Sequence, residues 1–157
     1  MKTSKRISLL ILVIIGIAQF FQPDKNQGDL TTIEPFLNET KPSEQVQKIL
    51  ETACYDCHSN STNYPWYAKI TPVNFWMDNH INHGKQELNF SRWNQYSSKR
   101  KEHKFDEIIE LVERKEMPLE SYTWVHKDAI LTDAQINQVV LWAKLAKIQY
   151  ALDKKPQ

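Results

Sequence analysis

The 157-residue sequence has little of several things that would mark a particular class of protein. It contains 3 glycines and 2 cysteines, and its 20 Lys and Arg residues are balanced by 19 Asp and Glu residues. The low glycine content excludes a collagen-like chain, and two cysteines exclude a scaffold held by several disulfides. The net charge of +1 gives no electrostatic basis for binding nucleic acid. With 157 residues, 41% of them hydrophobic, the chain is long enough for one globular domain and an additional tail or anchor.

An apolar run near the N-terminus predicts export from the cytoplasm. A basic segment that includes Lys5 and Arg6 precedes residues 7–21, ISLLILVIIGIAQFF. This order is typical of a signal peptide or an N-terminal anchor, and the positive-inside rule places the rest of the chain on the periplasmic side of a bacterial inner membrane. The run is shorter than the roughly 20 residues of a comfortable span, and Gly16 and Ala18 form only a weak cleavage site. We therefore expect a signal peptide or membrane anchor over residues 1–21, with a retained anchor favoured over secretion into the periplasm.

The remaining chain divides into three predicted parts. Residues 22–42 are polar, contain three prolines and are predicted to form a linker or extended arm. Residues 43–150 show helical periodicity and almost no strand alternation, which predicts an all-α domain. Residues 151–157 are predicted as a C-terminal tail.

The first two predicted helices are marked by their caps. Ser43 is placed to cap a helix whose apolar face runs on through both cysteines, to Cys57. Thr71 as N-cap and Pro72 in the first turn predict the start of a second helix, and Gly84 predicts its end. We expect the apolar face of this second helix to include Trp76, Met77, His80 and Ile81.

Two further helices complete the predicted domain. Apolar residues between Phe105 and Val112 mark a third helix, which must end before Pro118. Thr132 and Gln135 form a capping box for a fourth helix, whose apolar surface is so wide that we expect it to be largely buried. The charged run KRKEHK at residues 99–104 is predicted to be a solvated surface segment.

One pentapeptide carries the strongest chemical signal in the sequence. Residues 54–58 read CYDCH, a C-x-x-C-H motif, which is the attachment signature for c-type haem. Two thiols at this spacing add to the two haem vinyl groups as thioethers, and the adjacent histidine then reaches the iron. The motif predicts one covalently attached haem c, bound through Cys54 and Cys57 and ligated by His58.

Three other functions of the motif have less support from the sequence. A thioredoxin-like redox pair needs a βαβ context that this helical pattern lacks. A zinc site needs further ligands, and His80 and His83 offer only a weak set. A structural disulfide agrees with export but leaves His58 unexplained.

The sixth iron position has four candidate ligands. Met117 directly precedes Pro118, after a predicted helix end, where a loop can fold back over the haem. His80 is the alternative, although a histidine on an apolar helix face is more often a core residue or a haem propionate contact. His83 and His126 are predicted to be surface residues. We also expect tryptophans to shield the haem from water, the candidates being Trp66, Trp76, Trp93 and Trp142.

Three segments resemble a known family. The stretches CYDCHSNSTNYPWYAKITPVNFW, HINHGKQELNFSRW and MPLESYTWVHKDAILTDAQINQVVLWAK are similar to the bacterial haem-binding domain family with a C-x-x-C-H motif, which occurs in exported proteins and beside peroxidase-type cytochromes. The resemblance covers about residues 43–150, and the YPWY and NFS-x-W segments are particular to this family. The Met117-Pro118 pair also resembles the distal methionine loop of class I cytochromes c. This likeness implies a small cytochrome c-like domain in which the helix at 43–58 packs against the last helix.

These observations favour an exported electron carrier over an enzyme. The expected function is one-electron transfer by a monohaem c-type protein, to or from a redox partner protein in the periplasm or membrane. The alternative is a haem-based sensor or a peroxidase-like enzyme with an open sixth position, where His80 would act as acid or base.

Overall fold

The computed structural model describes residues 2–153, and all the regular elements of these residues are helices, joined by loops. The described residues contain no β-strand, and one antiparallel bridge joins Gln27 to Ser61. This confirms the predicted all-α class. The elements, in order, are α1 (Lys2–Ala18), η1 (Leu30–Ile33), α2 (Glu34–Thr40), α3 (Glu44–Ala53), α4 (Tyr55–His58), η2 (Trp66–Lys69), α5 (Val73–Glu87), η3 (Phe90–Gln95), α6 (Ser98–Glu113), α7 (Glu120–Thr123), η4 (Lys127–Ala129) and α8 (Asp133–Asp153).

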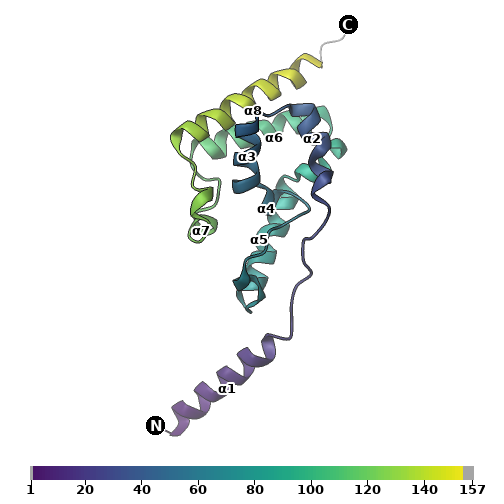
Figure 1. The fold of residues 1–157 in the computed structure, drawn as a ribbon. Helices are drawn as coiled ribbons and strands as arrows, with labels where there is room; N and C mark the ends of the chain where they lie inside the picture. The colour runs from purple at the N-terminus through teal and green to yellow at the C-terminus, as the bar shows by residue number, and fades with distance from the viewer. Residues whose placement is uncertain (1, 154–157) are drawn as a thin grey trace.

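Helices α6 and α8 pack along each other and form one side of the domain (Figure 1). The capping box of α8 is confirmed, because Gln135 Oε1 accepts from the Thr132 amide at 2.9 Å and Thr132 Oγ1 accepts from the Gln135 amide at 3.3 Å. The expectation that α8 is largely buried is wrong. Leu141, Leu145 and Ile148 are 61%, 61% and 54% exposed, because α6 covers one face of the helix and no other described element covers the opposite face.

An aromatic cluster fills the core beside α6 and α8. The ring of Phe36, from α2, lies 4.5 Å from Phe90 and 5.1 Å from Trp93 between centroids. Phe105 lies 5.3 Å from Trp93 and 5.5 Å from Trp142. The Phe36–Phe90 pair is tilted and the other three pairs are edge-on, a geometry that aromatic rings prefer, so the cluster contributes specific packing as well as buried area.

The charged run at residues 99–104 is solvated only in part: Lys99, Arg100 and His103 are exposed as expected, but two of its lysines are not. It forms the first turns of α6, and Lys101 and Lys104 are only 9% and 6% exposed. The Lys101 ammonium lies 2.8 Å from the Glu39 carboxylate, and the Lys104 ammonium lies 2.6 Å from that of Glu107. Long lysine stems can cover apolar surface when a carboxylate receives the charged end, which a sequence pattern does not show.

The segment at residues 22–42, expected to be a linker or arm, is folded against the domain over most of its length. Asp29 caps η1 by accepting from the Thr31 amide at 2.8 Å. Ile33 and Phe36 are 6% and 0% exposed and belong to the core. The polar composition of the segment therefore conceals two anchoring apolar residues.

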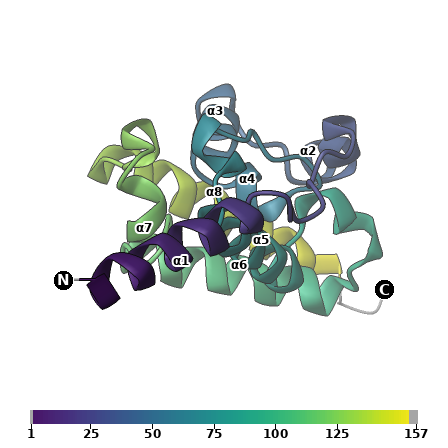
Figure 2. The same ribbon diagram turned by 90° about the horizontal axis from the view of Figure 1, so that it is seen from below.

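Helix α1 projects from the opposite end of the domain from α8 (Figures 1 and 2). Its apolar side chains, from Ile7 to Ile17, are mostly about half exposed or more. Within residues 2–153, no helix has both the length and the apolar character needed to cross a bilayer. At the other end, α8 continues through Asp153 into the predicted tail, and residues 154–157 of that tail lie outside the described part of the chain.

Candidate functional site

The C-x-x-C-H motif lies at a break between two helices and not on one continuous helix. Ser43 caps α3 as predicted, accepting from the Val46 amide at 3.3 Å. The helix ends at Ala53, because Cys54 has φ −126° and ψ −41°, outside the helical range. The short helix α4 then begins at Tyr55 and contains the rest of the motif. The prediction of one continuous helix at 43–58 is therefore wrong. The expected contact between the first part of that segment, α3, and α8 is present.

The His58 ring is oriented by two backbone carbonyls. Its Nδ1 lies 3.0 Å from Gly84 O and 3.0 Å from Leu88 O. Because carbonyl oxygens only accept hydrogen bonds, Nδ1 must carry the proton, which leaves the Nε2 lone pair available. Burial is the main cause that lowers the pKa of His58. A neutral histidine held through one nitrogen by a carbonyl is the usual arrangement of a metal-ligating histidine.

Gly84 allows α5 to approach the motif closely. A Cβ at this position would lie 2.8 Å from Cys57 O and 3.1 Å from Cys57 Cβ. Glycine is therefore required here by space, and α5 continues through it to Glu87. The prediction that Gly84 ends the second helix is wrong: the residue stays helical and brings its own carbonyl to His58. The predicted capping role of Thr71 is also wrong, since Pro72 is the N-cap residue and the cap makes no side-chain hydrogen bond.

The two thiols are half-buried and unpaired. Burial raises the pKa of Cys54 to about 12 and that of Cys57 to about 11. A neighbouring acidic group adds to the rise in each pKa: Cys57 for Cys54, and Asp56 for Cys57. Both thiols therefore stay protonated near neutral pH, and the structure does not join them in a disulfide.

A small hollow of about 50 Å³, partly open to solvent, lies beside Cys57. One wall comes from the motif and the loop after it, a second from α5, and a third from the segment that follows Met117 and Pro118. The lining residues are Asp56, Cys57, Thr62, Asn63, Pro65, Trp76, Met77, His80, Ile81, Leu119, Ser121, Tyr122 and His126. The predicted apolar face of the second helix thus lines this hollow, and Ile81 is its one deeply buried member.

The segment around α7 is tied to the motif by a chain of polar contacts. The Tyr122 hydroxyl donates to Asp56 Oδ2 at 2.7 Å, and Asp56 Oδ1 accepts from the Asn63 amide at 2.8 Å. Burial and then this hydrogen bond raise the pKa of Tyr122. The Tyr122 ring stacks on His126 at 4.2 Å, and His126 Nε2 lies 3.1 Å from the Tyr67 hydroxyl. His126 is therefore not the surface residue that was expected.

The candidates for the sixth iron position lie in different surroundings. Met117 is half-buried, packs against the core and does not line the hollow, whereas Leu119 and Ser121 just after it do. His80 lines the hollow, and its Nδ1 donates to Trp76 O at 2.8 Å, so that Nε2 is available. His83 is exposed, as predicted.

The tryptophans divide between the hollow, the core and the surface. Trp76 lines the hollow. Trp93 and Trp142 are 0% and 7% exposed within the aromatic core, and Trp66 is 76% exposed. Of the four tryptophans expected to shield a haem, the structure places Trp76 alone at the hollow beside Cys57.

Tyr55, the first residue between the two cysteines, has a buried hydroxyl for which the described residues offer no hydrogen-bond partner. The side chain is 6% exposed and its ring packs 5.6 Å from that of Phe90. An unsatisfied buried hydroxyl costs about 1–3 kcal/mol. This cost falls directly on the motif.

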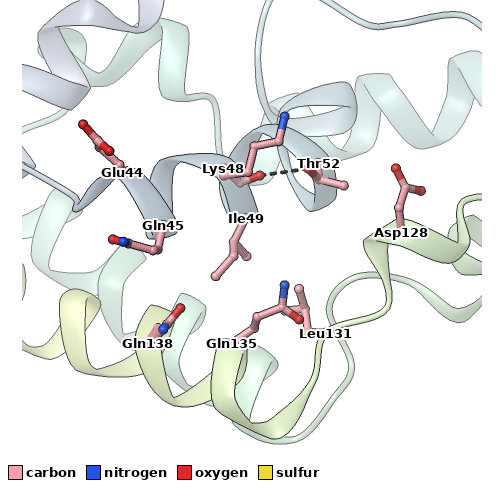
Figure 3. Close-up of a pocket in the computed structure, with 9 residues that line it drawn as sticks. All are labelled: Glu44, Gln45, Lys48, Ile49, Thr52, Asp128, Leu131, Gln135 and Gln138. Atoms are coloured by element: carbon pink, nitrogen blue, oxygen red, sulfur yellow. Dashed lines mark hydrogen bonds between the residues drawn. The ribbon is translucent and has the colours of Figure 1, made fainter.

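A second, larger hollow lies between α3 and the start of α8 (Figure 3). Its floor is formed by Ile49 and Leu131, and its rim carries glutamine, lysine and carboxylate side chains. None of the predicted haem-binding residues lines it. The chemistry indicated by the sequence therefore belongs to the smaller hollow beside Cys57.

Several residues that shape the site were not assigned this role from the sequence. Gly84 had a visible signal, since a glycine inside an apolar helical pattern often marks close packing. Met77 lines the hollow but had been assigned only to a helix face. The hydrogen bond between Asp56 and Tyr122 joins positions 66 residues apart, and the one between Tyr67 and His126 joins positions 59 apart, so no local pattern predicts them. Among residues 2–153, no group of three or more His, Cys, Asp or Glu side chains is arranged to hold a metal ion by itself.

Comparison with known proteins gives one positive result. Curated proteins and solved structures give no match to the chain. The model of a family described as a haem-binding domain matches residues 13–145. The match begins within α1 and ends within α8, so it includes the arm at residues 22–42 as well as the helical domain. The chain therefore belongs to the haem-binding domain family.

Proposed function

We propose that this chain holds one haem c covalently at Cys54 and Cys57, with His58 as the proximal iron ligand, and that it transfers single electrons. The observation that carries the proposal is the His58 ring, which is fixed by Gly84 O and Leu88 O with Nε2 available. The donor set also fits, because two unpaired thiols precede this histidine at the spacing of the C-x-x-C-H motif.

Haem would supply a one-electron redox couple, whose potential is set by the axial ligands, nearby hydrogen bonds and exposure to water. The chain's own residues perform the remaining tasks. Gly84 and Leu88 orient the proximal ring, Trp76 and Ile81 make the hollow apolar, and Tyr122 holds the α7 segment against Asp56.

The test of covalent attachment is the mass of the denatured chain. Protein made in a bacterial host with haem-maturation machinery should retain the added mass of one haem after denaturation. The Cys54→Ala, Cys57→Ala double variant should lose this mass, and His83→Ala should keep it, because the His83 side chain is exposed and does not line the hollow beside Cys57. An intact wild-type chain of unmodified mass would overturn the proposal.

We further propose Met117 as the sixth ligand. Its support is that the residues after Pro118 line the hollow with Cys57, which brings this loop to the site. Met117→Ala should lower the reduction potential and open the iron to carbon monoxide while leaving the haem attached. His80→Ala is the matched control and should change neither property. The opposite result would make His80 the ligand and Met117 a packing residue.

The alternative function, a sensor or peroxidase-like enzyme, is favoured by one observation. The hollow is lined by His80 and His126, and Met117 is not among its lining residues. If wild-type protein with attached haem binds carbon monoxide readily, the sixth position is open and this alternative replaces the carrier. A low-spin spectrum unchanged by carbon monoxide and by peroxide would support the carrier.

We also propose that the chain is exported and retained at the periplasmic face of a bacterial inner membrane by α1, where it meets its redox partner. The support is the basic start of α1 followed by its exposed apolar side chains. Fractionation tests this. Recovery in the soluble periplasmic fraction, with a mature N-terminus near Gln19, would show release and overturn the retained anchor.

A further inference from the structure

The end of α1 is bonded directly to the helical domain. Gln19 and Thr71 exchange two hydrogen bonds: the glutamine amide donates to Thr71 O at 3.1 Å, and the Thr71 amide donates to Gln19 Oε1 at 2.9 Å. Gln22 Nε2 donates to Lys69 O at 3.3 Å, and Gln22 Oε1 accepts from Asn74 Nδ2 at 2.9 Å. These bonds fix the direction in which α1 leaves the domain, so the two do not behave as parts joined by a free linker.

Exposed apolar side chains surround this attachment. We name Phe20, Phe21, Trp66, Ile70 and Phe75 the apolar collar. They are 87%, 64%, 76%, 41% and 45% exposed. Each lies within a few residues of one of the bonded positions, either at the end of α1 or across η2 and the first turn of α5. Several exposed large apolar residues in one region mark an interaction surface.

The length of α1 indicates what covers the collar. From Ile7 to Ala18 the apolar part of the helix rises about 18 Å, at about 1.5 Å per residue, against roughly 30 Å for the hydrocarbon core of a bilayer. Lys5 and Arg6 precede it and favour the headgroup region on the far side. With Lys5 and Arg6 at the headgroups on the far side, the apolar part of the helix ends before it has crossed the hydrocarbon core. The apolar residues after Ala18 are therefore drawn toward the bilayer. These residues begin with Phe20 and Phe21, and the bonded segment at residues 66–75 moves with them.

We propose that the apolar collar is a lipid-contacting surface that seats the domain on the membrane in one orientation. The side-chain types fit this role, since Trp is enriched at the membrane interface, and exposed Lys69 lies beside the collar, where its ammonium can reach anionic headgroups. Helix α8 lies at the opposite end of the molecule from α1 (Figure 1). The inference rests on the proposed retention of α1.

The experiment places a spin label on the full chain with haem attached, in vesicles of phosphatidylethanolamine and phosphatidylglycerol. Trp66→Cys and Phe75→Cys carry the label in the collar. Leu145→Cys, at 61% exposure on α8, is the matched control. The measured quantity is relaxation of the label by oxygen, which concentrates in lipid, relative to relaxation by a water-soluble nickel chelate. Unsubstituted chain treated with the label reports any signal from Cys54 and Cys57.

We expect the labels at positions 66 and 75 to show dominant oxygen relaxation and to lose nickel relaxation, and the label at 145 to show the reverse. If the chain floats with the vesicles but the collar labels are as accessible to nickel as the control, the lipid contact is overturned and the anchor stands. Labels shielded from both reagents would also overturn it, because protein would then cover the collar. A chain that fails to float with vesicles would overturn the retained anchor and the collar together.

Discussion

The part of the domain around α6 and α8 and the part around α4, α5 and α7 are held together by different means. The first has long helices and interlocked aromatic rings, and Phe36, Trp93 and Phe105 have no exposed surface. The second has short elements around a hollow, held by polar contacts such as the one between Tyr122 and Asp56. From this difference we infer that packing of the first part supplies most of the stability, which allows the second part to keep an apolar space beside the thiols.

The largest effect is expected from a substitution in the aromatic core. Trp93→Ala removes a fully buried ring that contacts Phe36 and Phe105, and whose Nε1 donates to the Tyr150 hydroxyl at 3.2 Å. We expect a loss of about 3–5 kcal/mol in the free energy of unfolding, measured by chemical denaturation. Trp124→Ala, at 64% exposure, should stay within about 0.5 kcal/mol of wild type. Similar losses in both variants would show that the core is not the main source of stability.

The next effect is expected at the contact between α5 and the motif. Gly84→Ala puts a Cβ 2.8 Å from Cys57 O, and the resulting shift costs about 1–3 kcal/mol, against a gain of about 1 kcal/mol in helix propensity. Because Gly84 O also holds the His58 ring, we expect less haem to be incorporated per chain, measured by haem absorbance against protein mass. Gly16→Ala, where a Cβ meets nothing within 4 Å, should incorporate haem normally.

The sequence predicted those features of the fold that depend on neighbouring residues. The caps at Ser43 and at Thr132 were found because a cap and its partner lie within three residues of each other. The end of α6 before Pro118 was found for the same reason, since proline acts on the residues next to it. The motif at 54–58 is local as well, so the cofactor could be predicted without knowledge of the fold.

The features that were missed depend on partners distant in the sequence. Phe36 belongs to the core because Phe90 and Trp93 reach it, and nothing within residues 22–42 reveals those partners. Lys101 is buried because Glu39, on another helix, accepts its charge. The exposure of Leu145 follows from the absence of a covering element among the described residues, and periodicity shows only that a face is apolar.

A smaller effect is expected in the second part of the domain. Tyr122→Phe keeps the ring that stacks on His126 but removes the hydroxyl that donates to Asp56 at 2.7 Å. We expect a loss of about 1 kcal/mol for this half-buried hydrogen bond. Amide hydrogen exchange should become faster through residues 119–126, with little change in α6 and α8. Equal acceleration throughout the domain would show that the two parts do not open independently.

The smallest effect concerns an exposed ion pair that joins the end of α6 to the start of α8. The Lys115 ammonium lies 2.8 Å from Asp133 Oδ1, and this hydrogen bond is the main reason that the pKa of Asp133 lies below its ordinary value of 3.8. A carboxylate with a lowered pKa in the folded state stabilises the fold above pH 3.8, and this contribution is lost as pH falls through the folded pKa. Asp133→Asn should therefore be slightly less stable than wild type at pH 6, and the difference should shrink by pH 2. Chemical denaturation at both pH values measures it. In a Lys115→Gln background the same substitution should lose most of its pH dependence, and an unchanged dependence there would assign the lowered pKa to the start of α8 itself.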